Sequence, residues 1–142
     1  MPDDILADFR DEIRTVNRRH LLVGEDGLLR PASFDDAFEL MYHDCAPDVA
    51  RWAYGHLTPE PPFTSNATAL TSKPWETIPT TYVVCTDDHS LPPAAQRALA
   101  TRAQKVVDFP TSHSPFLSRP DLVIDLLAAL VDPDTRAGGT EL

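Results

Sequence analysis

The stretch TTYVVCTDDHSLPP at residues 80–93 decides how the rest of the sequence is interpreted. Its first seven residues are a continuous run of β-branched, aromatic and apolar side chains, which is typical of a strand buried on both faces of a parallel sheet. Two aspartates, Asp87 and Asp88, follow the run directly, and the prolines after them suit the first turn of a helix. Because functional residues of parallel α/β sheets lie at the carboxyl ends of strands, these carboxylates are candidates for a site.

The residues after this stretch predict a second strand between two helices. PPAAQRALATRA at 92–103 predicts a helix, QKVVDF at 104–109 predicts a strand, and SRPDLVIDLLAALV at 118–131 predicts a helix with Ser118 as its N-cap. A twelve-residue crossover between the two strands predicts a parallel pair. Two parallel strands cannot bury both faces by themselves, so the fold requires more sheet than this sequence encodes.

The N-terminal part of the chain predicts helices over 3–18, 33–44 and 47–57, the second of them capped by Ser33. Residues 21–33 predict a short hairpin or an irregular loop. We expect these elements to form a small helical layer without a strand of its own. The helix over 47–57 is expected to bury one apolar face, made of Val49, Trp52, Ala53 and Leu57.

The charge and the cysteines exclude several classes of partner. The formal net charge is −10, and so negative a surface repels phosphate backbones and anionic lipid heads, so we expect no nucleic-acid and no membrane partner. The two cysteines, Cys45 and Cys85, follow no metal-binding spacing. The N-terminus has no apolar signal-peptide region, and no run reaches the roughly 20 apolar residues of a transmembrane helix, so we expect a cytoplasmic location.

A single histidine, His113, lies in a loop after the second predicted strand. Neighbouring parallel strands lie about 4.8 Å apart, so this loop and the aspartate loop can meet. An aspartate that accepts a hydrogen bond from the histidine Nδ1–H fixes the tautomer and leaves the other ring nitrogen as a base. In the alternative interpretation, Asp88 caps the helix that starts at 92 and His113 is a solvated loop residue. Spacing alone leaves both interpretations open.

Two segments resemble a known family. YVVCTDDHSLPPAAQ at 82–96 and TSHSPFLSRPDLV at 111–123 are similar to the last two strands of the α/β-hydrolase fold, in the esterase branch that includes methyl-salicylate esterases, hydroxynitrile lyases and bacterial relatives. The resemblance implies that Asp88 is the acid and His113 the base of a catalytic triad, which hydrolyses a small carboxylic ester and needs no cofactor. Leu91 stands where this family usually has isoleucine.

The resemblance extends to the N-terminal part of the chain. Residues 35–62 are similar to the helical cap of bacterial members, and WETIP at 75–79 leads from the cap into the strand. The implied fold class is α/β: the C-terminal part of an α/β-hydrolase fold, with two parallel strands and flanking helices, plus a small helical cap layer. The implied regions are a cap at 1–60, a proline-rich linker at 61–79, a βαβα unit at 80–131 and a frayed tail at 132–142.

The family's nucleophile is a serine in a G-x-S-x-G turn between a strand and a helix, and this sequence contains no such pentapeptide. None of its serines is flanked by glycines: Ser33, Ser65, Ser72, Ser90, Ser112, Ser114 and Ser118. We therefore expect no hydrolase activity from this chain alone. Three hypotheses stay open: a hydrolase whose serine lies outside this sequence, the obligate half of a split or self-associating hydrolase, and a non-catalytic binding module.

Other candidate residues carry weaker signals. YHDC at 42–45, with His56 further on, combines metal-ligand residue types without a metal spacing, so we expect no metal and interpret Asp44 as the cap of the next helix. His89 is expected to face solvent. The aromatic residues Trp52, Tyr54 and Phe63 are expected to lie in the core, or else to line a pocket under the cap.

Overall fold

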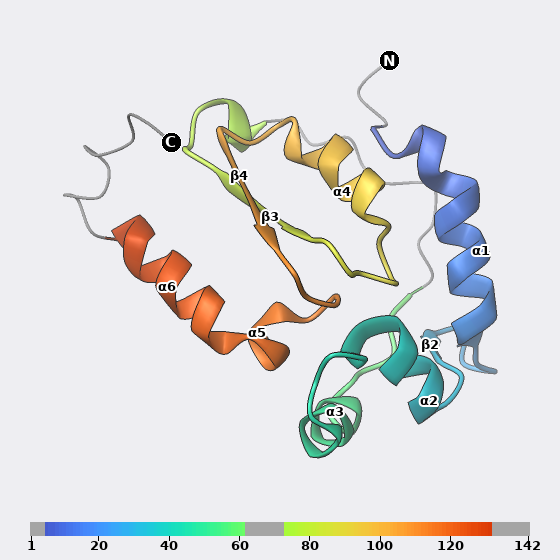
Figure 1. The fold of residues 1–142 in the computed structure, drawn as a ribbon. Coiled ribbons are helices and arrows are strands. Elements are labelled where there is room, and N and C mark those ends of the chain that lie inside the picture. Colours follow the sequence, from blue (N-terminus) through green and yellow to red (C-terminus); the bar gives the residue numbers. More distant parts are fainter. Residues whose placement is uncertain (1–4, 62–72, 132–142) are drawn as a thin grey trace.

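Two separate two-stranded sheets are present in the computed structural model, which describes residues 5–61 and 73–131 (Figure 1). Strands β3 (Thr81–Cys85) and β4 (Lys105–Phe109) pair in parallel, with Val83 opposite Val107. Strands β1 (Leu21–Val23) and β2 (Leu29–Pro31) pair antiparallel. The predicted parallel pair is therefore confirmed, and a hairpin is present in the N-terminal part.

The parallel sheet is covered by helices from its own βαβα unit. Helix α4 (Pro93–Ala100) connects β3 to β4 and packs against β3. After β4 come the short helix α5 (Pro115–Ser118) and the longer helix α6 (Pro120–Val131). In Figure 1, α4 and α6 lie on opposite sides of the strand pair. This order of elements confirms the predicted fold class, a parallel α/β unit with flanking helices.

The start of the last helix differs from the prediction. Helix α6 begins at Pro120, and Ser118 ends α5 instead of capping α6. The reason is local, because a proline disfavours helical geometry in the residue before it, and Arg119 accordingly leaves the helical region of backbone conformation. The helix can then restart only at the proline itself.

The N-terminal segment contains strands, and the expectation of a helical layer without them was wrong. A 3₁₀ turn (Ala7–Phe9) leads into α1 (Arg10–His20), which ends where β1 begins. Gly27 has φ of 75° in the turn between β1 and β2, a conformation that favours glycine. Leu29 also forms an isolated bridge with Glu60, which brings the end of the segment back to the hairpin.

The helices that follow the hairpin form the main apolar cluster. Ser33 caps α2 (Phe34–Ala37) by accepting from the Asp36 N–H at 3.1 Å, as predicted. The chain continues as a π-helix (Phe38–Tyr42) and then as α3 (Pro47–Tyr54). The buried members of the cluster are Ala37, Tyr42, Cys45, Ala50 and Ala53. Leu117 of α5 packs against them, so the cluster also contacts the βαβα unit.

The predicted apolar face of α3 is only partly correct. Ala53 is buried, but the side chain of Trp52 is 59 % exposed and that of Leu57 is 38 % exposed, while Ala50 is buried instead. Helix α3 ends at Tyr54, so Leu57 no longer lies on its face. Trp52 packs on the ring of His56, with the centroids 4.6 Å apart. Alanines at the interface let neighbouring segments approach closely, which leaves the larger residues outside.

The linker and tail predictions are tested only in part. A 3₁₀ turn (Pro74–Glu76) precedes β3, while residues 62–72 and the predicted tail at 132–142 lie outside the described residues. Gln104 donates from Nε2 to the Trp75 carbonyl at 2.9 Å and accepts from the Thr80 N–H at 2.6 Å. Trp75 is thereby attached to the residues at the start of both parallel strands.

Val84→Ala tests whether the sheet is the centre of stability. Val84 lies in β3 with none of its surface exposed, so the substitution removes buried methyl groups and leaves a cavity. We expect the free energy of unfolding to fall by about 2 kcal/mol. Val106→Ala is the matched control, because Val106 lies on β4 with 46 % of its surface exposed. Urea denaturation measures both, and equal losses would contradict the described burial.

Candidate active site

The carboxylate of Asp88 lies just beyond the end of β3 and is held by several donors. Its Oδ1 accepts hydrogen bonds from the N–H groups of Ser90 at 2.7 Å and Leu91 at 2.9 Å. Its Oδ2 accepts from Nε2 of Gln96 at 2.8 Å. Only 6 % of Asp88 is exposed, and a buried carboxylate is tolerated when donors of this kind replace its lost hydration.

The ring of His113 completes the set of partners around this carboxylate. His113 Nδ1 lies 2.9 Å from Asp88 Oδ2. An ionised carboxylate can only accept, so Nδ1 is the ring nitrogen that donates in this contact and Nε2 takes no part in it. The side chain of His113 is 40 % exposed, whereas that of Asp88 is 3 % exposed. The arrangement therefore fixes the orientation of the imidazole against a nearly buried carboxylate.

The second of the two aspartates is the one beside His113, as the sequence predicted. The carboxylate of Asp87 is 67 % exposed, and the Asp87 carbonyl accepts a hydrogen bond from His43 Nε2 at 2.9 Å. The alternative interpretation of Asp88 as the cap of α4 was wrong, because the N-cap position is Pro92 and no side chain bonds there. Asp88 Oδ1 instead stabilises the turn before the helix, while its Oδ2 contacts His113. The two roles use different oxygens and are compatible.

Gln96 of α4 holds the Asp88 carboxylate and was missed by the sequence analysis. Its Oε1 accepts from the Cys85 N–H at 2.8 Å, which identifies the other atom of the amide as the donor Nε2. Nε2 lies 3.2 Å from the Cys85 carbonyl and 2.8 Å from both the Leu91 carbonyl and Asp88 Oδ2. Gln96 is 3 % exposed. The available signal was a polar residue four positions before the buried Ala100, on the face of α4 that meets the sheet.

The loop that carries His113 is attached to the helical segment through Ser112 and Asp44. The Ser112 N–H donates to Asp44 Oδ2 at 2.8 Å, and the Ser112 hydroxyl contacts Asp44 Oδ1. Desolvation by the surrounding atoms raises the pKa of Asp44, but the hydrogen bonds from Ser112 and Ser118 outweigh it and hold this pKa below its usual range. The prediction that Asp44 caps α3 was wrong, because the N-cap position is Ala46 and no side chain bonds there.

The loop of Asp88 is also attached to the helical segment. The rings of His43 and His89 stack with their centroids 4.0 Å apart. His89 Nδ1 lies 3.1 Å from Glu39 Oε1. The side chain of His89 is 45 % exposed, so the expectation that it simply faces solvent was incomplete. Its ring connects the acid loop to the π-helix.

The described residues contain no group of three or more histidine, cysteine, aspartate or glutamate side chains arranged to hold a metal ion. In the YHDC segment, Cys45 is part of the apolar cluster, and burial raises the pKa of its thiol to about 11, so it stays protonated at neutral pH. His56 points its Nδ1 at the Trp52 carbonyl, 2.7 Å away. Cys45 and Cys85 are both buried and free.

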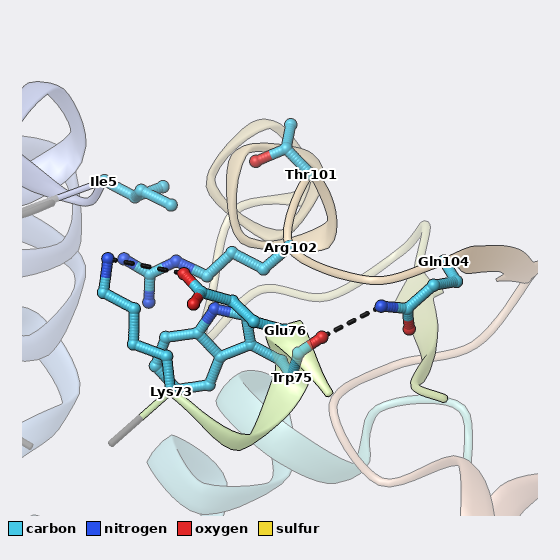
Figure 2. Close-up of a pocket in the computed structure, with 7 residues that line it drawn as sticks. All are labelled: Ile5, Lys73, Trp75, Glu76, Thr101, Arg102 and Gln104. Carbon is cyan, nitrogen blue, oxygen red and sulfur yellow. Dashed lines mark hydrogen bonds and ion pairs between the residues drawn. The ribbon is translucent and has the colours of Figure 1, made fainter. Parts of the chain in front are cut away.

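The aromatic residues expected in the core, or else under the cap, differ in their surroundings. Trp52 is exposed, so its placement in the core was wrong; Tyr54 packs edge-on against Phe34; and Phe63 lies outside the described residues. A hollow of about 480 Å³ lies elsewhere, at the start of the parallel strands (Figure 2). It contains Trp75 with Arg102 over its ring, and an ion pair between Lys73 and Glu76. The residues that line it include neither Asp88 nor His113.

In the part of the chain that the structure describes, no helix is both long and apolar enough to cross a membrane.

Comparison with known proteins gives consistent matches. The sequence profile of the family described as "Alpha/beta hydrolase family" matches residues 2–126. The alpha/beta hydrolase nvfD of Aspergillus novofumigatus (strain IBT 16806) is 33 % identical over 106 residues, which are 72 % of this chain and 42 % of that protein.

Solved structures show the same fold. Polyneuridine aldehyde esterase matches with a TM-score of 0.67 and 16 % identity, over 89 % of this chain and 56 % of its own. The pyrethroid hydrolase PytH matches with a TM-score of 0.63 and 20 % identity, over 84 % of this chain and 50 % of its own. The chain thus spans about half the length of the proteins that it matches.

Gln96→Glu tests how the Asp88 carboxylate is held. The substitution keeps the shape but places a carboxyl group against Asp88 and two carbonyls, so the folded state favours its protonated form and raises its pKa above the ordinary ~4.3. The unfolded state then loses its proton first, and stability falls as pH rises from about 4. We expect a loss of about 2–3 kcal/mol at neutral pH, measured by urea denaturation across pH. Gln104→Glu, an exposed site with similar bonds, should change little.

Proposed function

Because the chain belongs to the alpha/beta hydrolase family, we propose that it supplies the acid and the base of an ester hydrolase, with Asp88 as the acid and His113 as the base. The observation that carries the proposal is the 2.9 Å contact between His113 Nδ1 and Asp88 Oδ2. A catalytic triad requires this geometry of its histidine and its aspartate. A similar structure belongs to a protein named an esterase, which supports a small carboxylic ester as the substrate.

The proposed chemistry assigns one task to each group. His113 Nε2 removes the proton of a serine hydroxyl as the serine oxygen attacks the ester carbonyl, and then donates that proton to the leaving alcohol. Asp88 keeps Nδ1 protonated and stabilises the imidazolium that forms between these two steps. In the second half of the reaction, His113 Nε2 removes a proton from water as the water oxygen attacks the acyl carbonyl. The proton then goes to the serine oxygen, and the acyl group leaves as the acid. No group other than these side chains and water is required.

The nucleophile in this proposal is a serine outside the 142 residues of this sequence. The serines on either side of His113 do not serve. Ser112 is fully buried and its hydroxyl contacts Asp44. Ser114 is 4 % exposed and precedes α5. None of the serines lies in a G-x-S-x-G pentapeptide, the sequence of the tight strand-to-helix turn that exposes a nucleophile in this family.

A fluorophosphonate probe tests this assignment, because it labels only activated serines. We expect the chain alone to remain unlabelled. When the chain is combined with a polypeptide that carries the first strands and the serine turn of a family member, we expect labelling of that serine. Asp88→Asn should slow the labelling by about 10³–10⁴-fold, because the wrong tautomer faces the serine. His113→Gln should abolish it.

His56→Gln is the matched control, because His56 is exposed and contacts only the neighbouring part of α3. It should leave the labelling unchanged. Labelling of any serine in the chain alone would contradict the proposed division of the triad. Equal labelling with and without Asp88 would exclude the acid–base assignment and favour a non-catalytic binding module.

A second candidate function follows from the surfaces that the sheet leaves uncovered: docking of the complementary part of a hydrolase. The Thr86 N–H donates to the Phe109 carbonyl across the sheet, so every second residue before Thr86 also directs its backbone groups at β4. The backbone N–H and C=O groups of Thr81 and Val83 therefore face the outer edge of β3. On this edge the side chain of Gln96 bonds the backbone N–H and C=O of Cys85. On α6, Ile124 is 64 % exposed and Leu127 is 56 % exposed. An open strand edge and an exposed apolar helix face each favour contact with another polypeptide.

Light scattering across a concentration series tests this candidate. Without the complementary part, we expect two copies of the chain to associate through the same surfaces, so the mass rises with concentration. Ile124→Lys combined with Leu127→Lys should return the chain towards the monomer, because charged side chains disfavour an apolar contact. Val23→Lys, at a 57 % exposed position of β1, is the control. A monomer with a sharp thermal transition at every concentration would exclude association.

A further inference from the structure

The residue before His113 is fully enclosed. Ser112 has none of its surface exposed, and both of its donors meet the same carboxylate, that of Asp44, which lies 68 positions earlier in the chain. The N–H donates to Oδ2 at 2.8 Å and the hydroxyl contacts Oδ1. The same hydroxyl lies 3.0 Å from the Met41 carbonyl. The histidine loop is therefore fixed by the segment at the end of the π-helix.

The same segment also holds the acid loop. His43 Nε2 donates to the Asp87 carbonyl at 2.9 Å, and the His43 ring stacks on His89. Asp87 and His89 are the two neighbours of Asp88 in the sequence. Residues 39–44 therefore contact the chain directly beside each member of the pair and set the distance between the two loops. β3 and β4 place the loops at one sheet edge, but the strands alone do not fix the ring against the carboxylate.

We propose that Asp44 is a positioning residue for His113: by holding the backbone and hydroxyl of Ser112, it keeps the imidazole Nδ1 against Asp88. This inference rests on the proposed function, because it takes His113 as the base. Asp44 touches neither the ring nor a reacting atom. Asp44 acts on the ring only through the backbone, because the residue that it holds, Ser112, is the neighbour of His113 in the sequence.

The charge of Asp44 fits this role. The hydrogen bonds from Ser112, together with one from Ser118, keep the pKa of Asp44 below its usual range, so the carboxylate is ionised at neutral pH and accepts both hydrogen bonds of Ser112. A depressed pKa means that this stabilisation is present above the ordinary pKa of aspartate and is lost as pH falls through the lower, folded value. The attachment is thus intact at neutral pH.

Nuclear magnetic resonance on the isotopically labelled chain tests the proposal without a need for turnover. The His113 ring nitrogen shifts report which nitrogen carries the proton, and amide exchange reports the Ser112 N–H. In Asp44→Ala we expect Ser112 to exchange about tenfold faster or more, because a hydrogen bond to a charged group is lost. We also expect His113 to shift from the Nδ1–H tautomer to a mixture of the two tautomers.

Asp44→Asn is the conservative variant and should restore most of the effect. Its amide oxygen can accept from the Ser112 N–H, and its NH₂ can donate to the Ser112 hydroxyl, which then donates to the Met41 carbonyl. Asp48→Ala is the control for the charge change, because Asp48 is an exposed acid in the first turn of α3. If Asp44→Ala fails to fold, Ser112→Ala removes only the hydroxyl contact and should move the His113 shifts in the same direction.

Faster exchange at Ser112 with an unchanged His113 tautomer would overturn the proposal, because Asp44 would then hold the loop without affecting the base. An equal effect of Asp44→Asn and Asp44→Ala would also overturn it. Asp88→Asn separates this failure from that of the proposed function. If Asp88→Asn changes the His113 tautomer and Asp44→Ala does not, only the positioning role is wrong. If Asp88→Asn also has no effect, the acid–base pair itself is wrong.

Discussion

The enclosed carboxylate of Asp88 constrains the arrangement of everything around it. A pair of carboxyl oxygens with 6 % exposure needs a partner at each oxygen, and the chain supplies them from the turn before α4, from α4 itself and from the loop after β4. The turn, the helix and the loop must therefore pack together for both oxygens to keep their partners. The requirement explains why the amide of Gln96 is buried where an alanine would otherwise suit the packing of α4.

The two loops of the site are held from both ends. At the sheet, the parallel register of β3 and β4 brings their carboxyl ends to one edge. On the other side, the segment from Glu39 to Asp44 contacts the neighbours of Asp88 and of His113. This segment includes a π-helix, and irregular helical turns of this kind are frequent at functional sites. The helical layer is thus attached to the site rather than only covering it.

The sheet itself is unusually small for a parallel one. Two strands give each strand a single neighbour among the described residues, and α6 keeps several apolar side chains in contact with solvent. Parallel sheets are normally covered on both faces and extended on at least one edge. The match to about half the length of each related protein agrees with this geometry. Asp88 and His113 lie together in this part of the fold.

The pairing of Asp88 with His113 came from the resemblance of two loops to a known family, whereas the sequence by itself determined the parallel strands and the crossover helix. These follow from local patterns, because a buried strand, a proline-started helix and a strand-end loop each have a signature within a few residues. Only the tertiary structure decided the roles of Gln96, Asp44 and Ser112 and the exposure of Trp52. The Ser112–Asp44 contact joins residues 68 positions apart, and that of His43 with Asp87 joins residues 44 apart. No periodicity records such contacts, since they depend on how completed elements pack against one another.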